Sequence, residues 1–207
     1  AVAVGQSHSL ALLEDGRVVA WGDNRAGQTN VPAGLTGIVG IACGANHSLA
    51  VDGTGKVVTW GSNTSGETSV PSDLGHVVDV AAMSATSLAV RDDGVVRGWG
   101  KGVAPPAGLT NVVDLAASPY LVLAQRKDGV LMGWHLTGTP SLQVEGPPRA
   151  RSIGAGIWYS TNQAGARIVN THAVAARADG KVVVWGSNLD PAFTPPVGLS
   201  NVTAVAA

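Results

Sequence analysis

The stretch His8–Gly22, HSLALLEDGRVVAWG, decides the fold of this chain. Two short apolar runs are joined through Asp15-Gly16, and the second run ends at Trp21. Two β-type runs joined by Asp-Gly predict a hairpin, because the turn needs a positive φ that glycine adopts without steric cost. The same pattern recurs along the chain, so it is read as a repeat.

Five copies of this hairpin follow one another. In each copy a tryptophan stands five residues after the turn glycine; these are Trp21, Trp60, Trp99, Trp134 and Trp185, at spacings of 39, 39, 35 and 51 residues. An apolar run precedes each hairpin, and a polar return follows it. Each unit therefore reads strand A, strand B, the glycine turn, strand C and a return that sometimes carries a short fourth strand. Alternation dominates and no window has a helical period, so the chain is predicted to be all-β.

Sheets this small cannot bury both faces alone, but they can when they stack radially as blades of a β-propeller. We predict a single domain over residues 1–207, with about five blades of three to four antiparallel strands. The repeats run approximately over 1–37, 38–76, 77–111, 112–150 and 151–201, and residues 202–207 begin a further blade. Each repeated Trp is expected to lie as a wedge between blades. The ring is either incomplete, part of a longer propeller, or closed through another edge.

The pattern G-x-x-H-S-L-A-L, followed by D-G-x-V-x-x-W-G-x-N, runs from Gly5 to Asn24 and recurs in similar form from Gly44 to Asn63. It resembles the repeat of the regulator of chromosome condensation family. The sequence of residues 18–33, VVAWGDNRAGQTNVPA, resembles still more closely the propeller-type β-lactamase inhibitor proteins of actinomycetes. The resemblance implies a propeller that binds proteins. Members usually form rings with more blades than the five hairpins of this chain.

The turns between strands A and B are predicted to lie at the same end as the loops after each Trp, because strands A and C run in the same direction. Loops held by a rigid scaffold commonly carry binding. Unit five has an insertion in this turn, Ile157–Asn170, which we expect to be a loop. The candidate partner-binding residues are Tyr120, Trp158, Tyr159, Asn46, Gln6, Arg25 and His135.

Several polar side chains recur at fixed positions of the repeat. Three histidines occupy the same place in the repeat, His8, His47 and His172, and in other units Thr86 and Leu121 replace them. We expect each His to bond to backbone within its own blade and not to bind a metal. His8 and Ser9 are adjacent in a strand and point to opposite faces, which argues against a nucleophile pair. The turn aspartates stand one per blade and make no acid–base pair. We therefore expect no catalytic set, metal or cofactor.

Composition limits the partners. The formal net charge is −1 and 13% of residues are charged, which gives no general attraction to nucleic acid or to an anionic membrane. No apolar stretch is long enough to insert as a membrane span. The expected partner is a protein or a host surface, glycan included, and open blade edges also permit self-association.

Four functions stay open. The first is a non-catalytic protein-binding propeller, as a secreted, surface or assembly component. The second is a secreted β-lactamase inhibitor, for which the A–B turns offer few aromatic anchors beyond Tyr120, Trp158 and Tyr159. The third is a structural or adhesive domain of a phage tail or virion, and the fourth is guanine-nucleotide exchange. An extracellular, cell-surface or virion location and a bacterial or phage origin are expected.

Overall fold

The hairpin of strands B and C recurs five times in the computed structural model, always closed by a turn glycine with positive φ. The structure describes residues 1–102, 104–106, 108–119, 121–135, 143–144, 150–161, 165, 167–186 and 194–205, with the backbone alone at 135, 143–144, 157–161, 167–171 and 186. Sixteen strands and no helix are present in these residues. The predicted all-β fold of about five blades is confirmed.

The strands form five antiparallel sheets in chain order, here called blades 1 to 5. Blade 1 holds β1 (Val2–Val4), β2 (His8–Leu12) and β3 (Val18–Gly22); blade 2 holds β4 (Ile38–Cys43), β5 (His47–Asp52) and β6 (Val57–Gly61); blade 3 holds β7 (Val77–Met83), β8 (Thr86–Arg91) and β9 (Val96–Gly100). Blade 4 holds β10 (Val112–Ala117), β11 (Leu121–Arg126), β12 (Leu131–His135) and β13 (Gln143–Val144); blade 5 holds β14 (Ala150–Thr161), β15 (Arg167–Arg177) and β16 (Val182–Gly186). The predicted short fourth strand thus occurs as β13.

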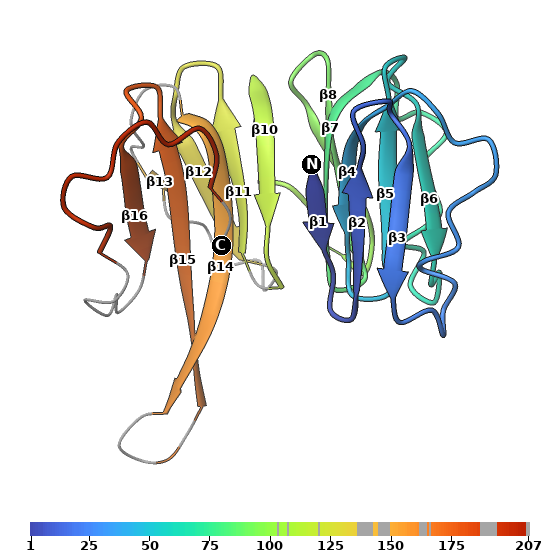
Figure 1. The fold of residues 1–207 in the computed structure, drawn as a ribbon, viewed down its shortest axis with the longest axis horizontal. Coiled ribbons are helices and arrows are strands. Elements are labelled where there is room, and N and C mark those ends of the chain that lie inside the picture. Colours follow the sequence, from blue (N-terminus) through green and yellow to red (C-terminus); the bar gives the residue numbers. More distant parts are fainter. Residues whose placement is uncertain are drawn as a thin grey trace. The chain divides into compact units, whose positions relative to one another are not determined.

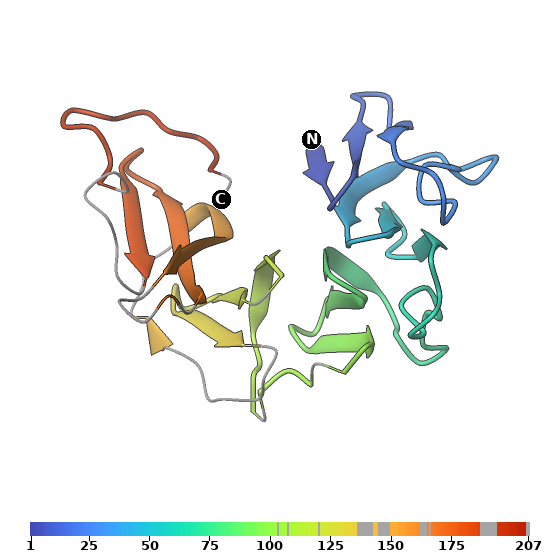
Figure 2. The same ribbon diagram turned by 90° about the horizontal axis from the view of Figure 1, so that it is seen from below.

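The chain divides into two compact units, residues 1–113 and 114–207. Figure 2 shows blades 1, 2 and 3 following one another in the first unit, coloured blue to green. The second unit holds most of blade 4 and all of blade 5. A single domain over the whole chain stays a prediction.

The glycine turns connect successive blades through the backbone. Gly16 O accepts a hydrogen bond from Ile38 N, the first residue of the next strand A, at 3.1 Å. The same bond joins Val77 N to Gly55 O, Val112 N to Gly94 O and Val202 N to Gly180 O, at 3.0 to 3.1 Å. Val202 therefore begins where a further strand A would begin. Residues 201–205 nevertheless form no strand, and no described strand pairs with them.

The core lies at the boundaries between blades within each unit. Leu10 of blade 1 packs in one apolar cluster with Ile38, Ala50 and Trp60 of the blade 2 repeat. Trp99 packs in the same way against the cluster that contains Leu49 and Val51, and Trp185 against the cluster that contains Leu121 and Leu123. The predicted wedge position is confirmed for these three tryptophans.

The insertion in blade 5 is not the loop that the sequence suggested. Strands β14 and β15 continue through it, with Ile157 opposite Thr171 and Thr161 opposite Arg167. Figure 1 shows this hairpin extending far past the ends of β11, β12 and β16. The physical reason is composition, since the segments IWYST and RIVNT are rich in β-branched and aromatic residues that favour strands.

Candidate partner-binding face

The A–B turns and the loops after the repeated tryptophans share one end of each blade in the first unit. The backbone N–H of Asp23 donates to Ser7 O at 2.8 Å in blade 1. The corresponding bonds are Ser62 N to Asn46 O at 2.9 Å and Lys101 N to Ala85 O at 2.8 Å. The expected position of the turns and loops at a common end is therefore confirmed for blades 1 to 3.

Neighbouring turns also touch one another across blades. Ala45 N, in the A–B turn of blade 2, donates to Ser84 O of blade 3 at 2.8 Å. Ser84 has a positive φ of 41°, which directs its carbonyl toward blade 2 at the cost of some backbone strain. The turns of blades 2 and 3 thus form one connected surface.

The loop 23–30 of blade 1 is held by its own side chains. The Asn24 side-chain oxygen accepts from Thr29 N at 3.0 Å, and the Asn24 amide donates to Asn30 at 2.7 Å. Gln28 is fully buried beneath the loop, and its side-chain oxygen accepts from Ala26 N at 2.9 Å. These hydrogen bonds fix the conformation of the loop in the free protein, which lowers the entropic cost of binding a partner.

Loop 62–69 of blade 2 repeats this design with a buried carboxylate. Glu67 accepts from the Ser62 hydroxyl at 2.7 Å and from Ser65 N at 2.6 Å. Burial raises the pKa of Glu67, but hydrogen bonds from the Ser62 hydroxyl, from its own backbone N–H and from Ser65 N outweigh burial, so the pKa lies below its usual value. The carboxylate is therefore a structural anchor of the loop.

A four-group hydrogen-bond relay joins blades 1 and 2 beneath these loops. His8 Nε2 lies 3.0 Å from Ser48 Oγ, and the Ser48 hydroxyl donates to Gln28 O at 2.8 Å. The same carbonyl accepts from Trp60 Nε1 at 2.9 Å. Because the Ser48 proton is directed at the carbonyl, His8 acts as the Nε2 donor and not as a base. The pair stabilises the interface and does not activate a nucleophile.

The relay is repeated between blades 2 and 3. Its members are His47, Ser87, Glu67 and Trp99, with distances of 3.0 Å from His to Ser, 2.7 Å from Ser to the carbonyl and 2.9 Å from Trp to the carbonyl. The expectation that each His bonds to backbone in its own blade is therefore wrong for His8 and His47. Strand alternation is the reason, since it turns each His toward the next blade and each Ser toward the preceding one. Val122 and Ala173 replace the serine in blades 4 and 5.

The first glycine of the G-x-x-H motif makes room for the ring. A Cβ on Gly44 would lie 2.0 Å from Cε1 of His47, and one on Gly5 would lie 2.5 Å from Cε1 of His8. Blade 5 keeps the same pair although the insertion separates it in sequence, since Gly156 is opposite His172 in the ladder. The glycine of the motif is therefore required because a side chain at its position would overlap the histidine ring.

Both relay histidines are neutral near pH 7. Burial lowers the pKa of His47 to about 4, with Glu67 opposing that shift. Burial also lowers the pKa of His8, opposed by the charge of Asp23. The Nδ1 atoms of both rings are buried and have no hydrogen-bond partner among the described residues. A second proton on either ring would thus be placed in an apolar site without an acceptor.

The structure brings some of the candidate residues together. Gln6 and Asn46 are exposed in the A–B turns of blades 1 and 2. Arg25 lies on the loop of blade 1, with its side chain 88% exposed and an ion pair to Asp23 at 2.9 Å. These three residues share the face described above, and their role in binding stays a prediction.

The remaining candidates lie in the second unit. The backbone of His135 ends β12 opposite Leu121, the register position that Gly22 holds in blade 1, so it begins the loop after strand C. Trp158 and Tyr159 lie in β14, opposite Asn170 and Val169. Tyr120 lies outside the described residues.

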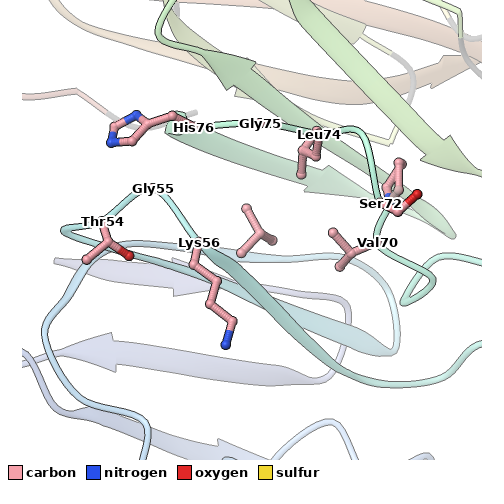
Figure 3. A pocket seen from close by; sticks show the side chains of 10 residues that line it. Thr54, Gly55, Lys56, Val70, Ser72, Leu74, Gly75 and His76 are labelled. Atoms are coloured by element: carbon pink, nitrogen blue, oxygen red, sulfur yellow. The ribbon is translucent and has the colours of Figure 1, made fainter.

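A shallow hollow of about 480 Å³ lies at the opposite end of blade 2. Figure 3 shows Thr54 and Lys56 of the B–C hairpin facing the return segment from Val70 to His76 across it. His76 Nδ1 is 3.9 Å from Asp92. No cluster of three metal-binding side chains occurs among the described residues, and no helix there is long and apolar enough to cross a membrane.

The fold and the relay define the chain as a β-propeller of repeated three- to four-stranded blades. Residues 1–28 and 38–67 match the family described as the regulator of chromosome condensation (RCC1) repeat. These matches cover blades 1 and 2, where the motif and the relay are complete. No curated protein was found to match.

Solved structures resemble the whole chain. Human WBSCR16 is 20% identical with a TM-score of 0.63 over 98% of this chain and 64% of that protein. Prp20p of Saccharomyces cerevisiae is 19% identical with a TM-score of 0.61 over 89% and 71%, and the CRINKLY ectodomain of the Arabidopsis thaliana receptor kinase ACR4 is 16% identical with a TM-score of 0.59 over 99% and 87%. The chain spans less than two thirds of the human protein. Together the matches support the RCC1-repeat propeller family.

Proposed function

We propose that this chain is a non-catalytic propeller that binds a protein partner, with the extended hairpin β14–β15 as the main contact element. The hairpin carries the proposal, because β14 and β15 run for 12 and 11 residues where the corresponding strands of blades 1 to 4 have three to seven. A two-stranded ribbon is marginally stable by itself. A partner surface that covers it would supply the missing contacts.

The composition of the hairpin and the loops beside the turns support this reading. Trp158 and Tyr159 stand in the extension, and aromatic residues are enriched among those that dominate binding energy. In blades 1 and 2 the loops next to the A–B turns are internally bonded and keep their shape. The solved structure of Prp20p is described with binding to Gsp1p and histones, so a protein partner has a precedent among similar folds.

A photo-crosslinking experiment tests this function. Benzoylphenylalanine is placed at position 159 and, as a matched control, at Thr54, which is exposed at the opposite end of blade 2. The probes are a Ras-type small GTPase, core histones and a class A β-lactamase, each purified. We expect one of them to be crosslinked from position 159 and not from position 54, with competition by the unmodified chain.

A second variant replaces residues 157–171 by the two-residue turn Gln-Ser of blade 1. We expect this variant to stay folded by circular dichroism and to lose at least about tenfold in affinity for the crosslinked protein. Unchanged affinity, or equal crosslinking at both positions for every probe, refutes the hairpin as the contact element. Nucleotide release from the GTPase, or inhibition of the β-lactamase, identifies which partner class is used.

A further inference from the structure

The hollow of blade 2 lies beside a B–C turn that differs from the other blades in its charges. In blades 1, 3, 4 and 5 the residue before the turn glycine is an aspartate that forms an ion pair with an arginine; the pairs are Asp15 with Arg17, Asp93 with Arg91, Asp128 with Arg126 and Asp179 with Arg177. In blade 2 Thr54 stands in place of this aspartate. The turn of blade 2 therefore has no carboxylate at this position.

The acidic side chain that this turn does contain, Asp52, is used within the turn. Its Oδ1 atom accepts hydrogen bonds from the Thr54 hydroxyl at 2.6 Å, from Thr54 N at 2.8 Å and from Lys56 N at 3.1 Å. The bond from the Thr54 hydroxyl is the main reason that the pKa of Asp52 lies below its ordinary value. Lys56 is exposed, and its ammonium forms no ion pair within the described part of the chain. Its charge is therefore available to a ligand.

The walls of the hollow are apolar and its rim is basic. The apolar side chains that line it are Val57, Val70, Pro71 and Leu74. Figure 3 shows Val70 and Leu74 pointing into the space between the hairpin and the return segment. Of the residues that line the hollow, Lys56 and His76 have ionisable side chains and none is acidic. Asp92, 3.9 Å from His76 Nδ1, is not part of the lining.

Backbone N–H groups add to the donors at the rim. The N–H of Val77 donates to Gly55 O at 3.0 Å. The N–H groups of Gly75 and His76 have no acceptor among the residues that the structure describes, and both residues are exposed. Gly75 has a φ of 75°. Successive backbone N–H groups in a turn of this kind form a concavity that favours an anion.

This backbone arrangement is specific to blade 2 within the first unit. In the returns of blades 1 and 3 the residue just before the next strand A has a positive φ, 67° at Gly37 and 58° at Asn111. In blade 2 the positive φ lies one residue earlier, at Gly75. The His76 ring lies over the turn, since a Cβ on Gly55 would be 2.6 Å from its Cγ. Blade 2 thus differs from its neighbours in both the charge of its turn and the backbone of its return.

We propose that this hollow binds the C-terminal end of a partner polypeptide whose last residue is apolar. The terminal carboxylate accepts hydrogen bonds from the N–H groups of Gly75 and His76, and the last side chain enters between Val70 and Leu74. The Lys56 ammonium reaches the same carboxylate on its flexible four-carbon stem. The volume of about 480 Å³ lies within the range of about 300–1,000 Å³ that is usual for ligand sites. Capture of a C-terminal carboxylate by backbone N–H groups is a recurring mode of peptide recognition.

A chain end fits the lining better than an internal acidic residue does. The last residue of a chain carries its carboxylate and its side chain on one Cα, so it meets the donors and the apolar walls together. An internal aspartate or glutamate uses its side chain for the carboxylate and has no apolar group left for the walls. The site is separate from the proposed partner contact of β14–β15, so each can fail without the other.

Fluorescence polarisation with the full chain tests the site. The probe is the fluorescein-labelled hexapeptide Gly-Ser-Gly-Ala-Leu-Val with a free C-terminus. Two control peptides carry a C-terminal amide, one with the same sequence and one with an internal aspartate, Gly-Ser-Gly-Asp-Leu-Val. We expect saturable binding of the free peptide and at least about tenfold weaker binding of both amides, because amidation removes the charge that the donors meet.

Substitutions at exposed positions locate the binding without risk to the core. Lys56→Gln is expected to weaken binding of the free peptide by about threefold to fivefold, as loss of an exposed ion pair does, and Lys56→Arg should retain it. Lys181→Gln is the matched control, since Lys181 follows the turn glycine of blade 5 as Lys56 follows that of blade 2. Ser72→Asp adds a negative charge to the lining and should abolish saturable binding. In the unsubstituted chain, the amide NMR signals of Gly75 and His76 should shift on addition of the peptide.

The outcomes separate the proposal from its alternatives. No saturable binding up to millimolar peptide overturns it, and so does equal binding of the free and amidated peptides. Equal affinities of Lys56→Gln and Lys181→Gln would place the peptide elsewhere on the chain and overturn it as well. Preferential binding of the aspartate peptide would assign the hollow to acidic side chains and refute the contact with a chain end.

Discussion

His8 Nε2 lies 3.0 Å from Ser48 Oγ, forty positions further along the chain and in the next blade. Both side chains are buried, and the Ser48 hydroxyl donates a hydrogen bond to Gln28 O. This contact and its repeat at His47 and Ser87 give blades 1, 2 and 3 polar links in a core that is otherwise made mostly of Leu, Val, Ala and Trp. The link is directional, so it fixes which face of a blade meets which.

Removal of the serine hydroxyl tests the link. Ser48→Ala leaves the His8 donor and one lone pair of Gln28 O unsatisfied in a buried site, which costs about 1–3 kcal/mol of unfolding free energy. Ser87→Ala should cost a similar amount at the next boundary. Urea denaturation measures both, with the exposed Ser72→Ala as control. A loss no larger than that of the control would show that the relay contributes nothing to stability.

Acid should weaken the first unit through the same histidines. Burial lowers the pKa of folded His47 to about 4 from 6.5, so the unfolded chain binds more protons between these values. The stabilisation is complete above pH 6.5 and is lost as the pH falls toward 4, by on the order of 3 kcal/mol. His8 acts in the same direction. Urea denaturation at a series of pH values gives the slope, and His47→Gln should flatten it; an unchanged slope in that variant would contradict the assignment.

Substitutions of Gly44 and of His47 should be energetically coupled in their effect on the free energy of unfolding. Gly44→Ala alone places a Cβ 2.0 Å from the His47 ring and is expected to cost several kcal/mol, as overpacking does. In the background of His47→Thr the clash is absent, and blade 3 already has Met83 and Thr86 at these positions. A double-mutant cycle should therefore give a coupling of about 1–3 kcal/mol. Additive effects would mean that the ring does not occupy the space above Gly44.

Much of this architecture could be predicted from the sequence. The period and the glycine turns depend on local rules, and the structure confirms them; it confirms the wedge position for Trp60, Trp99 and Trp185. The relay was missed although its signal was present. The alternation that separates His8 from Ser9 also aims them at opposite neighbouring blades, and the His-Ser dipeptide recurs one repeat later as His47-Ser48. Pairing across blades could have been inferred from that offset.

The prediction for blade 5 fails for a different reason. An insertion in one turn predicts a loop, but its residues continue the ladder register of β14 and β15. Periodicity over five residues is too short to separate a strand from an apolar loop, whereas strand propensity in IWYST and RIVNT favoured the strand. The binding role of the candidate residues depends on a partner, and the chain alone does not contain that information.

Gly94 and Gly27 have the same backbone conformation but differ in the space around them. A comparison of their alanine variants therefore distinguishes the cost of the left-handed conformation from the cost of a steric clash. Gly94 has φ of 77° and Gly27 has φ of 78°. A Cβ on Gly94 would lie 2.7 Å from Cα of Asn111, whereas on Gly27 the nearest atom is 3.5 Å away. Gly27→Ala should cost about 1–2 kcal/mol for the left-handed conformation alone. Gly94→Ala should cost distinctly more, measured by thermal or urea unfolding. Equal costs would mean that the turn and the next strand A do not need their tight backbone contact.

Trp21 and Trp60 hold the same register position in blades 1 and 2 but differ in how far they are buried. Their alanine variants therefore test how much burial of this tryptophan contributes to stability. Trp60 is 7% exposed and bonds to Gln28 O, while Trp21 is 50% exposed. Trp60→Ala should cost about 3–5 kcal/mol, as core Trp truncations do. Trp21→Ala should cost less than half as much, since half of its side chain is already exposed to solvent. Urea denaturation of both variants measures the two costs, and equal costs would contradict the assignment of Trp60 to the core.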